Sequence, residues 1–262
     1  MPTSRPLTGT RIAITRPAGT GGALARRVRA LGGVPLLLPG SSLRAADDSK
    51  AAREALKTAL ASDKVIFTSP AAVRFAHRLV PLHARMRCLA PGAGTHRALL
   101  HAGCANPVAP IREDSEGLLA LPALRDVRGM RIGIVGAPCG RGLLERALAG
   151  RGADVEHAYV YRRLPARLDR RHAEALRRDT RKPLYVLLSS AEALSRIPAG
   201  LPDDARRRLL AGSAVVSSGR LALIAHKAGF PRVLRAGTTH AADMLAAVIA
   251  DRMRGDHGRT HP

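Results

Sequence analysis

The sequence predicts an α/β fold built from two related halves. Short apolar runs alternate with Ala-, Leu- and Arg-rich segments of helical pattern, which is typical of parallel α/β units. The chain also repeats itself. Residues 11–17 recur as 131–137 and residues 65–73 recur as 185–193, both at an offset of 120, while residues 92–103 match 218–229 at an offset of 126. The repeat predicts two similar units with a functional site between them.

Nine short segments have the composition of β-strands, and helical patterns lie between them. The strands are expected at 11–15, 34–38, 64–68, 87–90, 131–135, 155–161, 184–188, 214–217 and 232–235, and helices at 21–31, 71–79, 95–102, 143–150 and 221–228. A glycine follows each of four of these helices, where left-handed backbone can end the helix: Gly32, Gly103, Gly152 and Gly229. Asp114 precedes the last helix of the first half and is a candidate N-cap.

Two extended segments interrupt this pattern at equivalent places in the repeat. Residues 34–39 and 158–165 follow the first βα unit of each half, and both end in proline. Because proline removes a donor from a β-ladder, we interpret them as linker strands rather than central strands of a sheet.

Composition limits the class of protein. The 262 residues suffice for two domains of about 100–150 residues. Charged residues interrupt every apolar stretch before the roughly 18–20 residues that a membrane span needs, and the N-terminus has no signal-peptide pattern, so we expect a cytoplasmic protein without a membrane segment. The three cysteines and ten histidines show no metal-binding spacing, so we expect no metal.

The net charge of +23 raises the question of a nucleic-acid partner. Only five of the 43 basic residues are lysines, a skew that suggests codon bias, and only six residues are aromatic, so base stacking has few candidates. A polyanionic small molecule fits this balance better, and we expect no nucleic acid.

Polar or Gly-rich turns follow several predicted strands, where open α/β sheets collect ligands and helix N-termini offer free N–H groups. The candidate substrate-binding residues in these turns are Arg16, Ser69, Thr95, Gly136, Arg141, Ser189, Ser190, Ser218 and Arg220. Each has a structural alternative. Serines at helix starts can be N-caps, arginines can form surface ion pairs, and the turn 136–142, which matches no nucleotide-binding motif, can be a plain tight turn.

Tyr161 is the candidate catalytic residue, as a phenol that can donate a proton to a leaving group. The alternative is a linker tyrosine with a packed ring. Tyr159 shares its face of an extended chain, so the pattern alone does not choose between them.

Taken together, these segments resemble uroporphyrinogen-III synthases over residues 10 to 250. The resemblance rests on residues arranged in order across both repeats: Ile14–Pro17, Ile66–Arg74, Gly94–Thr95 with Gly103, Asp114–Leu119, Val160–Arg163, and Val216–Ser218 with Gly229–Phe230. It implies two Rossmann-like domains that exchange their first βα unit and are joined by a two-stranded antiparallel linker, with the active site in the cleft. The expected domains are 1–35 plus 166–262 and 41–155, with linker strands at 34–40 and 156–165.

The resemblance also implies the reaction. Hydroxymethylbilane, a linear tetrapyrrole with eight carboxylates, would lose its hydroxyl and close with ring D inverted to give uroporphyrinogen III, without cofactor or metal. Tyr161 matches the family tyrosine that assists departure of the hydroxyl, and Ser69, Thr95 and Ser189 match cleft positions. We expect a monomer, and leave open a transient handover of substrate from hydroxymethylbilane synthase.

The chain departs from the family pattern at a few positions. Leu221 stands where the second half often has a threonine equivalent to Thr95, with Arg220 beside it as a possible substitute, and Ala71 and Cys139 stand where Asn and Gly are common. Two other functions stay open at this point: a non-catalytic two-lobed binder of an anionic metabolite, and, on charge alone, a nucleic-acid-binding protein.

Overall fold

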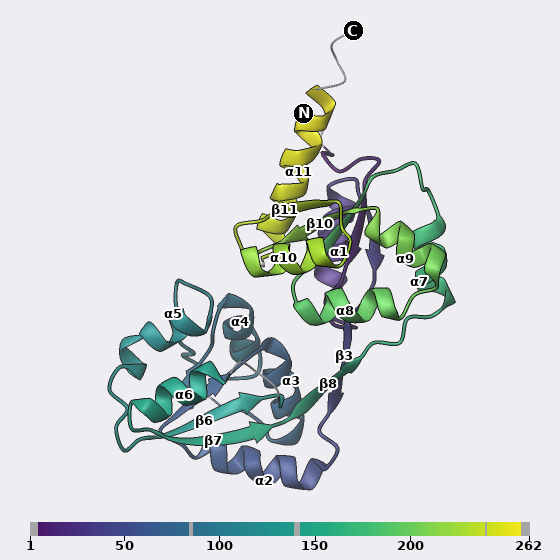
Figure 1. Ribbon diagram of the computed structural model, residues 1–262. Coiled ribbons are helices and arrows are strands. Elements are labelled where there is room, and N and C mark those ends of the chain that lie inside the picture. The colour runs from purple at the N-terminus through teal and green to yellow at the C-terminus, as the bar shows by residue number, and fades with distance from the viewer. Residues whose placement is uncertain (1–4, 84–85, 139–141, 239, 258–262) are drawn as a thin grey trace. The chain divides into compact units, whose positions relative to one another are not determined.

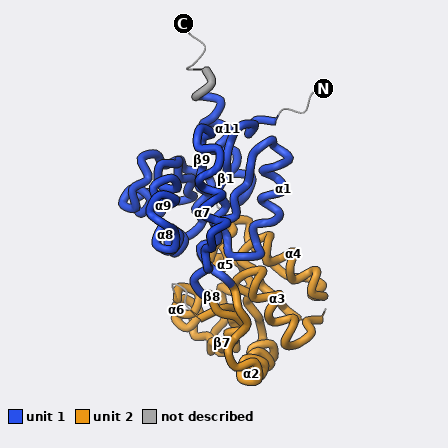
Figure 2. Tube along the Cα trace, turned by 90° about the vertical axis from the view of Figure 1, so that its right-hand side faces the viewer, with its two compact units in different colours: residues 1–42, 164–262 blue, residues 43–163 orange. Residues whose placement is uncertain are grey.

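The protein consists of two compact units, each an α/β structure (Figure 1). The computed structural model describes residues 5–83, 86–138, 142–238 and 240–257. Unit 1 comprises residues 1–42 and 164–262, and unit 2 comprises residues 43–163 (Figure 2). In both units helices cover the two faces of a parallel sheet, so the predicted fold class is confirmed.

Unit 1 contains a five-stranded parallel sheet of order β11-β10-β9-β1-β2. Its strands are β1 (Arg11–Ile14), β2 (Val34–Leu37), β9 (Leu184–Leu188), β10 (Ser213–Val216) and β11 (Arg232–Arg235). Strand β1 lies between β2 and β9, with Arg11 in register with both Val34 and Leu184. The first βα unit therefore folds with the C-terminal part of the chain, which confirms the predicted exchange.

Helices of unit 1 bury both faces of this sheet. One core layer joins it to α7 (Arg170–Arg177), α8 (Ala191–Ala199), α9 (Asp203–Leu210) and α10 (Gly219–Lys227), and the other to α1 (Gly22–Ala30) and α11 (Ala241–His257). The alternation of side chains along β9 distributes Val186 to the first layer and Tyr185 to the second. All five residues of β9 are buried, as expected for a strand covered on both faces.

Unit 2 contains a four-stranded parallel sheet of order β5-β4-β6-β7. Its strands are β4 (Lys64–Phe67), β5 (Cys88–Leu89), β6 (Arg131–Gly136) and β7 (Asp154–Tyr159). One face packs on α2 (Ser49–Leu60), α3 (Pro70–Leu79) and α4 (Ala93–His101), and the other on α5 (Ser115–Ala120), the 3₁₀ turn η1 (Pro122–Leu124) and α6 (Leu143–Gly150).

Two further strands, β3 (Ser41–Ala45) and β8 (Tyr161–Pro165), form a two-stranded sheet where the chain passes from one unit to the other. The backbone N–H of Ala46 donates to the carbonyl of Val160, and Ser42 Oγ donates to the carbonyl of Pro165. Positions rise along one strand while they fall along the other, so the pair is antiparallel, as the family resemblance implies.

The structure corrects which segments form this linker. Residues 34–40, expected as a linker strand, begin with β2, an edge strand of the sheet of unit 1. The N–H groups of Val34 and Leu38 donate to the carbonyls of Thr10 and Ile14, so Pro35 lies in the alternate phase and its missing donor faces away from the ladder. Residues 156–165, expected as one linker strand, divide into the end of β7 and β8.

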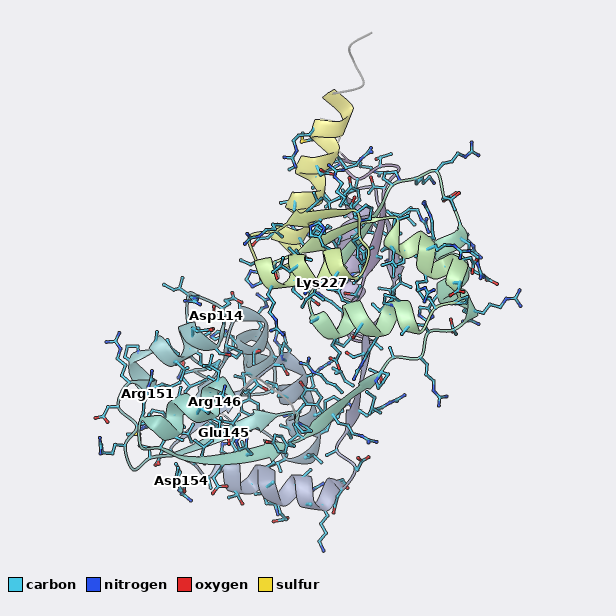
Figure 3. The ribbon with its side chains drawn as sticks, viewed as in Figure 1. Asp114, Glu145, Arg146, Arg151, Asp154 and Lys227 are labelled. Carbon is cyan, nitrogen blue, oxygen red and sulfur yellow. The ribbon has the colours of Figure 1, made fainter. Side chains whose placement is uncertain are left out.

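The four glycines expected to end helices all have left-handed backbone. Their φ angles are +87° at Gly32, +98° at Gly103, +83° at Gly152 and +98° at Gly229. Asp114 caps α5 as expected, since its carboxylate accepts from the N–H of Gly117 at 2.7 Å (Figure 3). Within the described ranges, no helix is both long and apolar enough to span a membrane.

Candidate active site

Tyr161, the first residue of β8, is a buried side chain of unit 2 whose hydroxyl contacts Ser69. Its side chain is 2% exposed and its ring stacks on that of Phe75, with centroids 5.4 Å apart and planes 13° apart. Its hydroxyl lies 3.1 Å from Ser69 Oγ. The stacking fixes the ring, and the hydrogen bond fixes the direction of the phenol oxygen.

Ser69 lies between β4 and α3 and is the N-cap of that helix. Its extended backbone lets Oγ accept from the N–H of Ala72 at 3.1 Å, while Pro70 occupies the first helical position, where no donor is lost. A serine hydroxyl has one proton and two lone pairs, so Ser69 can accept from Ala72 and still donate to the phenol oxygen of Tyr161. The N-cap role of Ser69 is therefore compatible with a role in the site.

The structure distinguishes the two tyrosines that the pattern left equivalent. Tyr159 ends β7, is 46% exposed and stacks on His157 with ring centroids 5.4 Å apart. At Val160 the chain leaves the sheet of unit 2, and Tyr161 begins a different strand pair. Because the two residues belong to different strands, the rule that alternate residues share a face does not apply to them.

Near Thr95 the structure adds a residue that sequence reasoning missed. Thr95 is buried in the first turn of α4, and the carboxylate of Glu113 accepts from the N–H of Ala93 at 3.0 Å in that turn. A Cβ at Gly92 would lie 2.4 Å from Glu113 Oε2, so glycine is required for this approach. Glu113 lies 20 residues from Ala93 in sequence, and its place beside the capping Asp114 was the one local signal for it.

Gly136 ends β6 and is a packing glycine. A Cβ there would lie 2.5 Å from Thr68 Oγ1, and its carbonyl accepts from the N–H of Val160 at 3.0 Å. This contact gives the glycine a structural reason. Arg141 and Cys139, in the same turn, lie outside the described residues.

In unit 1, the candidate residues follow three neighbouring strands of the sheet. Arg16 comes after β1 and is half-buried, and burial lowers the pKa of its guanidinium. Ser190 caps α8, with Oγ accepting from the N–H of Ala193 at 3.2 Å, and Ser218 caps α10 in the same way through Leu221 at 3.3 Å. The structural partner of Ser69 in the second repeat is thus Ser190, whereas the offset of 120 predicts Ser189, which is exposed.

The departure from the family pattern at Leu221 is also resolved. Leu221 and Thr95 both lie buried in the first turn of their helices, so leucine replaces threonine at an inward position. Arg220 is exposed on the same turn and forms no hydrogen bond or ion pair with residues that the structure describes. It does not occupy the place of the missing threonine.

The described candidates lie at the carboxyl ends of parallel strands. Those of unit 1 follow β1, β9 and β10, and those of unit 2 follow β4, β5 and β6, so that each group shares one edge of its sheet. Direct contact joins Ser69 and Tyr161. Among the described residues, no group of three or more His, Cys, Asp or Glu side chains is placed to hold a metal ion.

Comparison with known proteins gives consistent matches. A family model described as uroporphyrinogen-III synthase HemD matches residues 22–246. The uroporphyrinogen-III synthase of Salmonella typhimurium is 34% identical over 226 residues, covering 84% of this chain and 92% of that protein. The enzyme of the same name from Escherichia coli is 33% identical over 234 residues, with the same shares covered.

Solved structures share the fold. A mutant uroporphyrinogen III synthase from Thermus thermophilus is 24% identical with a TM-score of 0.57, covering 94% of this chain and 99% of that one. The uroporphyrinogen-III synthetase of Helicobacter pylori is 15% identical with a TM-score of 0.60, covering 92% and 99%. At these identities the likeness establishes the two-domain α/β architecture.

Proposed function

The chain belongs to the uroporphyrinogen-III synthase family, and we propose that it closes hydroxymethylbilane to uroporphyrinogen III with inversion of ring D. Family membership supports the reaction, and the contact between Tyr161 and Ser69 carries the assignment of the residue that starts it. The enzyme acts as a lyase that eliminates water and needs no cofactor or metal.

The first step is departure of the hydroxyl group of the substrate. Tyr161 donates its phenol proton to that oxygen, the carbon–oxygen bond breaks, and water leaves with the bonding electrons. The developing phenolate is stabilised by Ser69, whose hydroxyl lies 3.1 Å away at the N-terminus of α3. Since the side chain of Tyr161 is 2% exposed, the mechanism requires that substrate binding give access to its oxygen.

Closure then follows from the chemistry of the azafulvene cation left behind. Its exocyclic carbon is attacked by the substituted carbon of ring D, and the resulting spiro intermediate fragments and recloses with ring D inverted. A final proton leaves the ring carbon as aromaticity is restored, and it replaces the proton that Tyr161 gave. The overall change is loss of one water molecule.

Binding of the eight carboxylates is assigned to the turns at the carboxyl edges of the two sheets. Arg16 supplies a half-buried positive charge, while Ser69, Ser190 and Ser218 supply hydroxyl groups at helix N-termini that favour anions. We also assign Thr95, Ser189 and Gly136 to the substrate-binding turns. These turns belong to both of the expected domains, 1–35 plus 166–262 and 41–155.

Beyond the reaction, we propose a cytoplasmic monomer that accepts hydroxymethylbilane directly from its synthase in a transient encounter. The net charge of +23 supports rapid capture of an octacarboxylate, since a basic protein attracts a polyanion over several ångströms. A non-catalytic binder of an anionic metabolite would show the same attraction, so charge does not separate the two functions.

The test is incubation of the protein with freshly prepared hydroxymethylbilane, followed by separation of the product isomers. We expect the type III isomer to dominate. Spontaneous closure gives the type I isomer, so binding of the substrate with a type I product would establish the non-catalytic binder and contradict the enzyme.

A further inference from the structure

Unit 1 contains a cavity of about 450 Å³ at the edge where its strands begin. Its lining includes the segment that leads into β9, the start of β11 and two residues of α11. All five strands of this sheet are parallel, so this edge is opposite to the turns that follow β1, β9 and β10. The cavity is therefore separate from the residues assigned to the substrate, and its volume lies within the range typical of small-molecule sites.

The lining of this cavity is strongly basic. Five cationic side chains and one carboxylate face it among the described residues, namely Arg181, Lys182, Arg208, Arg232, Arg252 and Asp251. Lys182 is partly neutralised by Asp179, with Nζ and Oδ2 3.0 Å apart. The remaining positive charge exceeds the negative charge, which favours an anionic ligand.

The single carboxylate is already satisfied. Asp251 is buried, accepts a hydrogen bond from the hydroxyl of Tyr185 at 2.8 Å, and forms an ion pair with Arg232. Burial, followed by the hydrogen bond to Asp251, raises the pKa of Tyr185 to about 12, so the phenol stays protonated and continues to donate. Asp251 therefore joins α11, β9 and β11 at the base of the cavity.

A purely structural explanation accounts for part of this charge. Arginines near helix ends and loops often bind free carbonyl groups, and Arg208 Nη2 does donate to the carbonyls of Thr180 and Lys182. However, the Nε–H of Arg208 is buried without a partner in the described structure. Arg181 is exposed and forms no hydrogen bond or ion pair with any described residue. The guanidinium of Arg181 and the Nε–H of Arg208 are thus not used in binding carbonyl groups.

A neighbouring arginine adds to the local positive charge. Arg11 is buried at the start of β1, with Nη2 donating to the carbonyls of Ala175 and Leu176. Burial and the nearby charge of Arg208 both lower the pKa of Arg11. An anion bound beside Arg208 would offset this repulsion between like charges.

We propose that this cavity is a second ligand site, which binds a small polyanion carrying two or more phosphate or carboxylate groups. Arg181 contacts the anion directly through its exposed guanidinium, and Arg208 supplies positive charge at the lining of the cavity. Occupation of the site stabilises unit 1 through Asp251 and Tyr185, which connect α11 to the central strand β9.

The test is titration calorimetry of the full chain with inorganic pyrophosphate, with citrate as a second probe to separate phosphate from carboxylate recognition. We expect saturable binding of at least one probe at a single site. R181Q removes the direct contact at an exposed position, and R208Q removes one positive charge from the lining of the cavity. Each should weaken binding at least tenfold, and circular dichroism checks that R208Q is folded.

Two matched variants give the controls. R207Q removes the same charge from the same helix, outside the cavity, and should leave the affinity for pyrophosphate unchanged. R16Q removes a charge from the opposite edge of the sheet and should also leave it unchanged. Three results would each overturn the proposal. R207Q could weaken pyrophosphate binding as much as R208Q does, or R16Q could weaken it while R181Q does not. The third is that neither probe binds saturably.

Discussion

Tyr161 is positioned by a short chain of hydrogen bonds that begins in a helix. The N–H of Ala72 donates to Ser69 Oγ, which lies 3.1 Å from the phenol oxygen, and Phe75 of the same helix stacks on the ring. Three residues of the segment that forms α3 and its cap therefore fix one tyrosine of β8. In sequence they lie about ninety residues away, which explains why the pattern around Tyr161 alone did not reveal its partner.

Replacement of Tyr161 by phenylalanine should lower kcat with little effect on folding. Loss of a general acid typically reduces rate by about 10²–10⁴-fold, whereas loss of one hydrogen bond costs about 1 kcal/mol of unfolding free energy. Steady-state kinetics and urea unfolding of the same preparations measure the two effects.

Tyr159→Phe is the matched control, because it removes the same hydroxyl from the neighbouring, exposed tyrosine. We expect kcat within about twofold of the wild type, in keeping with the small effects of most surface substitutions. Full activity in Tyr161→Phe, or equal loss in both variants, would remove the proton-donor role of Tyr161.

Tyr185 predicts a loss of stability at alkaline pH. Its pKa is raised to about 12 in the folded chain, whereas an unfolded tyrosine titrates near about 10. The contribution of the protonated Tyr185 to the stability of the folded chain is therefore complete below a pH of about 10. It is lost as the pH rises through 12. Tyr185→Phe should be less stable at neutral pH and lose less stability across this interval. Urea midpoints of both proteins at several pH values measure the slopes, and identical slopes would contradict the assignment.

At the scale of single elements, helix caps show where the internal repeat is informative and where it misleads. Ser69 and Ser190 cap α3 and α8, although the offset of 120 aligns Ser69 with Ser189. Strands repeat closely because buried residues must match a fixed register. Strand β9 has five residues where β4 has four, and one residue separates each strand from its cap, so the cap moved by one position.

The cap assignment can be tested by paired alanine variants. Ser190→Ala should lower the unfolding free energy by about 0.5–2 kcal/mol, because the N–H of Ala193 loses its acceptor. Ser189→Ala should change it by less than about 0.5 kcal/mol, since that side chain is exposed. Chemical denaturation of the two variants gives the comparison, and the opposite order would restore the alignment at offset 120.

Elements with strong local signals could be predicted from the sequence, and elements formed by distant pairing could not. The glycines after four helices and the cap at Asp114 follow from local backbone chemistry. Strand β3 was missed because its sequence, Ser-Ser-Leu-Arg-Ala, is short and polar, and it becomes a strand only by pairing with β8. Pro35 argues against a central strand of a sheet, and the structure places it in β2, a strand at the edge of the sheet.

At the scale of the whole molecule, the exchange of the first βα unit determines which residues share a site edge. Arg16 follows β1, which pairs with β9, so it joins Ser190 at the carboxyl edge of one sheet although the two are far apart in sequence. The repeat and the resemblance together predicted this exchange. Glu113 at the first turn of α4 was not predictable, because its contact depends on how a loop returns to the helix.

Unit 1 has two separate basic regions. The carboxyl edge of its sheet carries the proposed substrate residues, and the opposite edge carries the cavity around Arg208. The net charge of +23 thus does not describe a single binding surface. Loss of activity in R16Q with retained pyrophosphate binding would show that the two regions act independently.

The measurement that tests the account most directly is the isomer composition of uroporphyrinogen formed as enzyme concentration is raised at fixed hydroxymethylbilane. Enzymatic closure competes with spontaneous closure, so the type III fraction should rise with enzyme concentration toward complete conversion, and Tyr161→Phe should need a far higher concentration to reach the same fraction. A type I product whose proportion is independent of enzyme concentration would contradict the central claim.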